Sequence, residues 1–213
     1  MRPSSGLLVL ALLLAGPPRG EAATVEGRVA LRPEAPAPIA RPRYPVAAAY
    51  TVREPDPPSA VVYLEGNFGD AAASPAGAVA QRGYQFAPGL LAVRRGSTVR
   101  FPNLDEEYHS VFSYSKTRRF DLGRYQRDET PPELRFEQAG VVRLFCEIHE
   151  HMRGTILVLD TPYFTRTDAE GRYRLDGLPA GRFTVKAWLD EETVRAQTVE
   201  LRDGPPARAD FPE

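Results

Sequence analysis

The sequence predicts an all-β protein made of two β-sandwiches, one inserted in or adjoining the other. Short runs rich in β-branched and aromatic residues recur along the chain, separated by turns that contain Gly or Pro. No apolar repeat with the helical period extends over the length of a helix. Strands without intervening helices do not form βαβ units, so the sheets are expected to pack face to face.

The composition excludes two broad classes of protein. The chain has 213 residues, of which 42% are hydrophobic and 26% charged, and its 27 Lys and Arg residues nearly balance 28 Asp and Glu residues. A net charge of -1 provides no basic excess for binding nucleic-acid phosphates. The apolar content is too high for a fully disordered chain. A globular protein of one or two domains is therefore expected.

Residues 1–22 have the features of a secretory signal peptide. Arg2 supplies positive charge, Leu7–Ala15 is an apolar run, and small residues precede an expected cleavage site before Ala23 or Thr24. A membrane anchor is the alternative, but this run is less than half of the roughly 20 apolar residues that span a bilayer. We therefore expect export to the periplasm or the outside, and no membrane span after cleavage.

The first part of the expected mature chain contains two strands and a proline-rich loop. Residues Thr24–Leu31 alternate in polarity, and Ala60–Gly66 is a short β-rich run closed by glycine. Between them, residues 33–58 carry eight of the 21 prolines. Because proline can neither continue a helix nor serve a central strand, an extended surface loop is expected there. The small-residue stretch 71–80 is interpreted as a linker.

From Gln81 to Asp160, short strands recur between turns. The predicted strands are Leu90–Val93, Thr98–Phe101, Val111–Ser113, Glu133–Glu137, Val141–Cys146 and Thr155–Leu159. In the strand that ends at Cys146, alternation places Arg143 on the face opposite to Cys146. Because Arg143 is expected to face solvent, Cys146 should point inward at the end of its strand.

The scarce residue types gather in this segment. Cys146, His149, His151 and Met152 lie within seven residues, and His109 is the only other His. In an arbitrary exported protein a lone Cys is a buried inert thiol or part of an intermolecular bridge. Its neighbours here favour a metal-ligating loop, because two His with Cys and a long axial Met form the blue-copper set. His109 would supply the second imidazole.

The order of these residues resembles the cupredoxins, specifically the plastocyanin and amicyanin group. The matching motifs are Gln85-Phe86-Ala87-Pro88, Val93-Arg94-Arg95-Gly96-Ser97-Thr98-Val99, Phe101-Pro102-Asn103 with His109, and Gly140-Val141 leading to Cys146, His149 and Met152. The resemblance covers residues 81–159 and implies a Greek-key sandwich with one type 1 copper ion as cofactor. It implies a thiolate ligand, two imidazole ligands and a weak axial thioether, supplied by Cys146, by His109 and His149, and by Met152.

Three features refine the comparison with the family: one agrees with the amicyanins, and two depart from the family pattern. The two residues between His149 and Met152 form the short loop seen in amicyanins. Many members follow the upstream His with Asn, whose side chain braces the ligand loops, whereas this chain has Ser110, a shorter hydroxyl. His151 has no counterpart in the pattern, and we interpret it as a solvated loop side chain rather than a ligand.

The flanks of this segment suggest a second, smaller sandwich. Two strand patterns between Thr167 and Val185 are joined by a Gly/Pro turn, and are similar to carboxypeptidase regulatory-like, transthyretin-type repeats. Such repeats usually begin with Gly-x-Val and Val-Tyr-Leu strands, which occur here at 27–29 and 62–64. The resemblance therefore implies one discontinuous domain, 24–70 plus 160–203. The alternative is that the N-terminal part extends the cupredoxin.

Two further features bear on contacts with other surfaces. Trp188 lies opposite the face of Phe183 and Val185 in its strand, and we interpret it as packing between the two domains, ahead of a partner-docking role. A group of arginines would offer a dock for an acidic redox partner, although a loose charge run is more often solvated surface. These are Arg118, Arg119, Arg124 and Arg127.

These expectations lead to a functional hypothesis. Four protein ligands leave no open position for a substrate, so copper would cycle between two oxidation states and the protein would be an electron carrier rather than an enzyme. Its partners would be an unidentified redox donor and acceptor, and in the resembling family electrons pass through the loop imidazole, here His149. Two alternatives remain open. One is a periplasmic copper-binding or delivery protein, and the other is a cell-envelope interaction module with a vestigial copper site.

Overall fold

The computed structural model describes residues 22–32, 52–54, 56–66, 68–69 and 77–213. Within these ranges the chain forms 17 strands and no helix, which confirms the predicted all-β fold. Accordingly, the described residues contain no helix long and apolar enough to cross a membrane. The predicted signal peptide, apart from its last residue, and most of the proline-rich loop lie outside the described residues.

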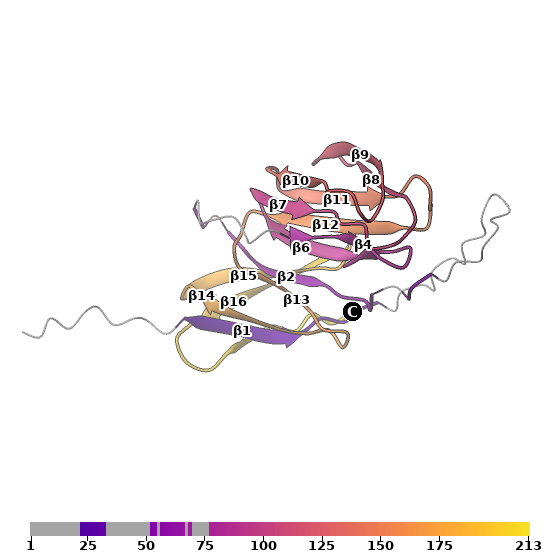
Figure 1. Cartoon of the computed structure of the whole chain (residues 1–213). Coiled ribbons are helices and arrows are strands. Elements are labelled where there is room, and N and C mark those ends of the chain that lie inside the picture. The colour runs from indigo at the N-terminus through magenta and orange to yellow at the C-terminus, as the bar shows by residue number, and fades with distance from the viewer. Residues whose placement is uncertain (1–21, 33–51, 55, 67, 70–76) are drawn as a thin grey trace, which may run out of the picture.

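Two facing sheets, which we call the lower sandwich, contain strands from both ends of the chain (Figure 1). One sheet has the order β14-β1-β17 and the other the order β13-β2-β15-β16. These strands are β1 (Ala23–Arg28), β2 (Val61–Glu65), β13 (Phe164–Arg166), β14 (Arg172–Leu178), β15 (Gly181–Trp188), β16 (Val194–Leu201) and β17 (Ala207–Arg208). Apolar side chains of both sheets form one core, which includes Val25, Leu64, Val185 and Leu201.

The remaining strands form the upper sandwich. Its sheets have the orders β6-β12-β11-β8-β9, β10-β7-β3 and β4-β5. These strands are β3 (Gly77–Ala78), β4 (Ala80–Gln81), β5 (Phe86–Ala87), β6 (Leu90–Arg94), β7 (Ser97–Arg100), β8 (His109–Tyr114), β9 (Arg119–Tyr125), β10 (Glu133–Phe136), β11 (Gly140–Phe145) and β12 (Arg153–Leu159). Their side chains form a second core, which includes Val99, Phe101, Phe136 and Leu144.

The chain leaves the lower sandwich after β2 and returns to it with β13. This is the strand order that the predicted insertion requires, whereas the division into separate domains stays a prediction. The lower core extends past the predicted boundary at residue 203, because Ala209 and Phe211 are buried in it. The segment after residue 203 contains three prolines and only isolated apolar residues, so its pattern did not indicate a core contribution.

The strands β3, β4, β5, β9, β13, β16 and β17 were not predicted. Three of them, β3, β4 and β9, have little apolar signal. β3 and β4 occupy the end of the expected linker 71–80, whose first residues lie outside the described ranges. β3 pairs with β7 through its backbone, which needs no bulky side chain. β9 is an edge strand that carries two Arg and one Asp, and its side chains alternate between exposed and half-buried positions over most of its length. Backbone pairing with β8 therefore compensates for a weak apolar pattern.

Trp188 packs at the junction of the two sandwiches. It is 8% exposed and clusters with Val61 of β2 and with Leu157 and Leu159 of β12. This is the position that the sequence analysis favoured over an exposed docking role. The lower sandwich therefore covers part of the outer face of the five-stranded sheet in the upper sandwich.

Candidate metal centre

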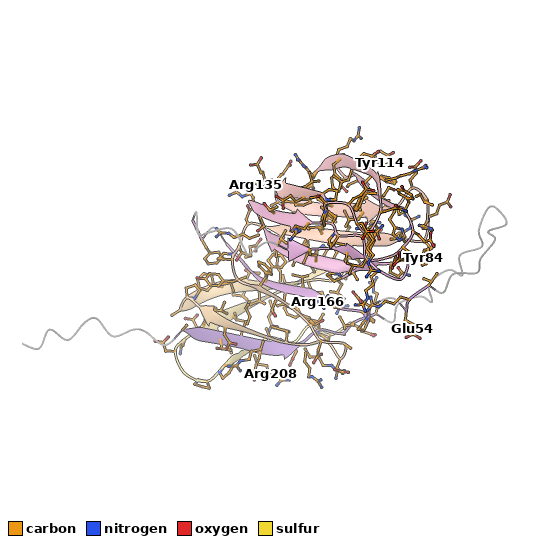
Figure 2. The ribbon with its side chains drawn as sticks, viewed as in Figure 1. Glu54, Tyr84, Tyr114, Arg135, Arg166 and Arg208 are labelled. Carbon is orange, nitrogen blue, oxygen red and sulfur yellow. The ribbon has the colours of Figure 1, made fainter. Side chains whose placement is uncertain are left out.

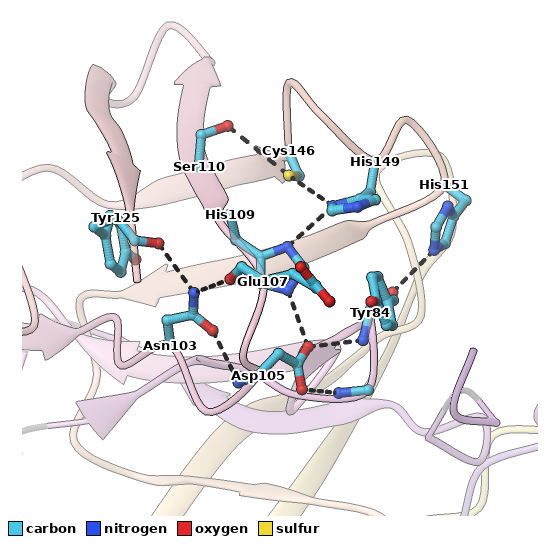
Figure 3. Close-up of polar contacts among 11 residues, drawn as sticks. Tyr84, Asn103, Asp105, Glu107, His109, Ser110, Tyr125, Cys146, His149 and His151 are labelled. Carbon is cyan, nitrogen blue, oxygen red and sulfur yellow. Dashed lines mark hydrogen bonds and ion pairs between the residues drawn. The ribbon is translucent and has the colours of Figure 1, made fainter. Parts of the chain in front are cut away.

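Three side chains with metal-ligating atoms converge at one end of the upper sandwich (Figure 3). His109 begins β8, Cys146 follows the last residue of β11, and His149 lies in the loop between β11 and β12. β11 pairs antiparallel with both β8 and β12, so the start of β8 and the β11–β12 loop lie at the same end of the sheet. The topology thus brings together residues that are far apart in sequence.

The donor atoms of these three residues lie within 4.8 Å of one another. Nδ1 of His109 is 3.1 Å from Nδ1 of His149, which is 3.8 Å from Sγ of Cys146. The side chains of His109 and Cys146 are buried, and His149 is half-buried. Two imidazole nitrogens and one sulfur at this spacing can together hold a transition metal ion.

Met152, the fourth predicted ligand, is fully buried in the same core cluster as Cys146. Its backbone N–H donates to the carbonyl oxygen of His149 at 2.9 Å, which closes the loop into a tight turn before β12 begins. Met152 is therefore held beside the part of the loop that carries His149. Its role as an axial ligand stays a prediction.

The donor cluster favours the thiolate form of its cysteine. Burial alone would raise the pKa of the Cys146 thiol, but hydrogen bonds from the imidazoles of His109 and His149 lower it to about 5. Burial would lower the pKa of His109, but hydrogen bonds to Cys146 and Asp105 raise it above its ordinary value. The thiolate, rather than the thiol, is the form of cysteine that binds a metal.

Asp105 orients His109 from the side away from the cluster. Its Oδ2 atom lies 2.9 Å from Nε2 of His109, and the carboxylate also accepts backbone N–H groups of Gly83 and Tyr84 at 2.6 and 3.0 Å. Burial would raise the pKa of Asp105, but these hydrogen bonds lower it. Because Nε2–H donates to a carboxylate, Nδ1 of His109 is left to face the other donors.

The turn at Tyr84 contacts both imidazole ligand candidates. Tyr84 has a φ of 57°, and its ring meets those of His109 and His149 edge to face, with centroids 5.6 and 5.0 Å apart. Nε2–H of His151 donates to the backbone carbonyl of Tyr84 at 3.0 Å. The interpretation of His151 as a solvated side chain is therefore wrong, because it is half-buried and bonded to the backbone. Burial lowers its pKa.

Ser110 joins β8 to the ligand loop. Its Oγ atom accepts the backbone N–H of Glu147 at 2.8 Å and lies 3.9 Å from Sγ of Cys146. On the outside of the loop, the Glu147 carboxylate accepts two hydrogen bonds from Arg124 of β9, at 2.8 and 3.1 Å. The shorter hydroxyl thus bridges the two ligand-bearing segments in this chain.

Asp105, Tyr84 and Asn103 have roles at the site that were not predicted from the sequence. The Asn103 amide donates to the carbonyls of Glu107 and Tyr125, and its Oδ1 accepts the N–H of Asp105, so it shapes the loop before His109. A carboxylate four residues before a candidate ligand was the one available signal for Asp105. No sequence pattern pointed to Tyr84, because its contacts depend on the conformation of its turn.

Comparisons with known proteins find structural likeness but no family assignment. No family model matches the chain, and no curated protein matches it. A reduced mutant of amicyanin is 20% identical, with a TM-score of 0.37, over 46% of this chain and 98% of its own. A purple cupredoxin from Nitrosopumilus maritimus is 20% identical, with a TM-score of 0.36, over 39% of this chain and 99% of its own. A copper-containing nitrite reductase from Thermus scotoductus SA-01 is 23% identical, with a TM-score of 0.37, over 62% of this chain and 28% of its own.

Proposed function

We propose that the chain is an exported one-electron carrier rather than an enzyme, with one type 1 copper ion held by His109, Cys146, His149 and Met152. The observation that supports this most directly is the convergence of two imidazole nitrogens and one sulfur within 4.8 Å at a largely buried position. A thiolate with imidazoles favours copper over hard cations such as magnesium or calcium. When bound, copper would supply a centre that alternates between Cu(I) and Cu(II).

The protein's own residues would hold these ligands in one arrangement in both oxidation states. Asp105 fixes the orientation of His109, and Ser110 ties the loop of Cys146 to β8. Positioned ligands reduce the rearrangement that accompanies electron transfer, as outer groups do in other metal sites. Of the four proposed ligands, His149 is the one that is half-exposed, so electrons would enter or leave through it.

We also propose that residues 24–70 plus 160–203 form one discontinuous domain of the carboxypeptidase regulatory-like, transthyretin type, and that its boundary extends to Phe211. A single apolar core that contains strands from both flanks supports this division. Residues 81–159 would be the cupredoxin domain. The protein would work in the periplasm or outside the cell with a redox donor and acceptor.

The test of this function is the visible absorption and EPR spectrum of residues 23–213 loaded with Cu(II). We expect an intense thiolate-to-copper charge-transfer band and a narrow hyperfine splitting, both lost in Cys146→Ser. His151→Gln is the matched control, because an amide can still donate to the Tyr84 carbonyl and His151 is not a proposed ligand. This variant should keep the band.

Two other outcomes would point elsewhere. A folded protein that bound no stoichiometric copper in either oxidation state would exclude the proposed function. A colourless protein that bound Cu(I) tightly and released it to a competing chelator would instead indicate copper delivery.

A further inference from the structure

The outer face of the five-stranded sheet is covered at one end and open at the other. Along β11, Val141, Arg143 and Phe145 share this face, because alternate side chains of a strand point the same way. Val141 packs against the junction cluster of Trp188. Arg143 donates two hydrogen bonds to Glu191 of the lower sandwich, at 3.0 and 2.9 Å. Phe145 lies beyond both of these contacts.

Three aromatic side chains form a continuous strip at the open end. Phe145 stacks on Phe112 of β8, with ring centroids 5.7 Å apart and an interplanar angle of 29°. Phe112 in turn contacts Tyr114, at 5.2 Å between centroids. Tyr114 is 69% exposed, and Figure 2 labels it at the top of the molecule, away from the lower sandwich. Phe112 and Phe145 are half-buried, so the three rings form a contiguous aromatic surface that is most exposed at Tyr114. We call Phe145, Phe112 and Tyr114 the aromatic strip, because contiguous accessible rings mark a contact surface more than single ones do.

An arginine lies over each end of the aromatic strip. The guanidinium carbon of Arg153 is 5.1 Å from the centroid of the Phe145 ring, and that of Arg119 is 5.8 Å from the centroid of the Tyr114 ring. Both arginines are exposed, and among the described residues their side chains contact these rings and form no ion pair. Their charges are therefore available to carboxylates of another protein.

The charged residues around the aromatic strip differ from those around Arg124 and Arg127, two of the arginines that were predicted to dock a partner. Arg124 and Arg127 form ion pairs with Glu147 and Glu106, which reduces their net charge toward a partner. Lys116 and Arg118, in the turn between β8 and β9, add positive charge beside Tyr114. An acidic residue also lies here, because Asp121 is opposite Phe112 on β9, where its carboxylate accepts the N–H of Gly123. Acidic residues of the lower sandwich, Asp190 to Glu192, lie near Arg143 at the covered end of this face. At the open end, the charged residues named here are four basic ones, Lys116, Arg118, Arg119 and Arg153, and one acidic one, Asp121.

We propose that the aromatic strip is the docking surface for an acidic one-electron carrier protein. The rings would pack against an apolar centre on the partner, and Arg119 and Arg153 would bind carboxylates around it. Protein interfaces are enriched in aromatic residues and Arg, and opposite charges guide the encounter.

The strip begins at Phe145, the residue before Cys146, so a partner bound there lies next to the thiolate ligand. With Cu(I) held by the proposed ligands, the site would give one electron to an oxidised partner and be left with Cu(II), and no proton would need to move. This step rests on the proposed function. Binding of the partner at the strip does not require the metal.

The test uses metal-free, 15N-labelled protein and a matched pair of probes. One probe is cytochrome c with succinylated lysines, an acidic one-electron carrier, and the other is unmodified cytochrome c, which is basic. At low ionic strength, the succinylated probe should change the amide resonances of residues 112–119, 145 and 153. The double variant Arg119→Gln with Arg153→Gln should bind it at least about fivefold more weakly. Arg100→Gln with Arg182→Gln removes two exposed arginines from other strands and should bind it like the parent.

Several results would overturn the docking proposal. These are resonance changes confined to the surroundings of His149, equal weakening in both double variants, an equal response to the two probes, or no response to the acidic one. A failure to bind copper would leave this measurement unchanged, so the docking surface and the proposed function can fail separately.

Discussion

Groups that are not proposed ligands determine where the ligands of the metal centre lie. The Asp105 carboxylate accepts hydrogen bonds from an imidazole and from two backbone N–H groups, and so links His109 to the turn at Gly83 and Tyr84. A buried donor that loses its acceptor costs the free energy of its desolvation, and bonds to charged acceptors are the stronger ones. A substitution of Asp105 should therefore lower the free energy of unfolding more than the loss of an ordinary surface hydrogen bond does.

Asp105→Asn should lower the free energy of unfolding of the metal-free protein by about 2–3 kcal/mol, because the amide removes the charge and one of the two acceptor oxygens. Urea denaturation would measure this change. Asp121→Asn is the control, since Asp121 accepts a single N–H on an exposed edge strand and its loss should cost about 0.5–1 kcal/mol. Equal losses for the two variants would show that Asp105 has no special role.

Ser110→Ala should destabilise the protein by about 1–2 kcal/mol, because it leaves the part-buried N–H of Glu147 without its acceptor. In the copper-loaded protein, it should also shift the thiolate charge-transfer band, since the hydroxyl lies 3.9 Å from Sγ of Cys146. Urea denaturation and visible absorption would measure the two effects. Ser110→Thr retains the hydroxyl and should restore the band position, and a band that stays unchanged in the Ala variant would contradict the second expectation.

At this scale the sequence predicted which side chains converge but not what holds them. His109, Cys146 and His149 were identifiable because their residue types are scarce and their order follows a known pattern. Tyr84 was not, because its contacts depend on a positive φ that residues other than glycine rarely adopt. His151 was misinterpreted for the same reason, since its partner is the carbonyl of that turn.

Individual strands show where apolar periodicity succeeds as a predictor and where it fails. β11 alternates between buried and more exposed positions, β12 is buried along most of its length, and both were predicted close to their observed bounds. β3 and β17 have two residues each and are placed by backbone pairing, so composition alone did not reveal them. β17 also depends on a close backbone approach, because a Cβ atom on Gly27 would lie 1.9 Å from the carbonyl oxygen of Ala209.

Gly27→Ala should therefore displace the segment that follows β17 and lower the free energy of unfolding by about 3 kcal/mol or more. Thermal unfolding followed by circular dichroism would measure the loss. Gly89→Ala is the matched control, because the nearest heavy atom to its added Cβ is the carbonyl oxygen of Phe86 at 3.9 Å, an ordinary contact. Similar losses for both variants would show that the close approach at Gly27 does not govern stability.

In the whole molecule, the two sandwiches are joined through an apolar cluster, an exposed ion pair between Arg143 and Glu191, and hydrogen bonds such as that from Arg166 to the carbonyl of Leu90. Trp188 supplies the largest side chain of that cluster, and burial of a tryptophan contributes more than an exposed pair such as Arg143 with Glu191. The junction therefore depends mainly on packing. This makes the coupling between the sandwiches sensitive to Trp188 in particular.

Trp188→Ala should cost about 3–5 kcal/mol and split the calorimetric unfolding of the protein into two transitions, with the lower sandwich melting first. Arg143→Gln should cost at most about 1 kcal/mol and leave the shape of the transition unchanged, because both partners are more than two-fifths exposed. Differential scanning calorimetry distinguishes these cases. A single transition in Trp188→Ala would mean that the sandwiches are coupled by other contacts.

The insertion of the upper sandwich between β2 and β13 in the sequence also affects the order in which the two sandwiches can fold. During synthesis the N-terminal strands appear first, but β1 pairs with β14 and β17, and β2 pairs with β13 and β15. The strands from β3 to β12 pair among themselves and include every proposed ligand or its adjoining loop. Since contiguous segments close shorter loops and emerge as units, the upper sandwich can fold before the rest of the chain has appeared. The proposed ligands would then be in place before β1 and β2 have paired with strands from the C-terminal part of the chain.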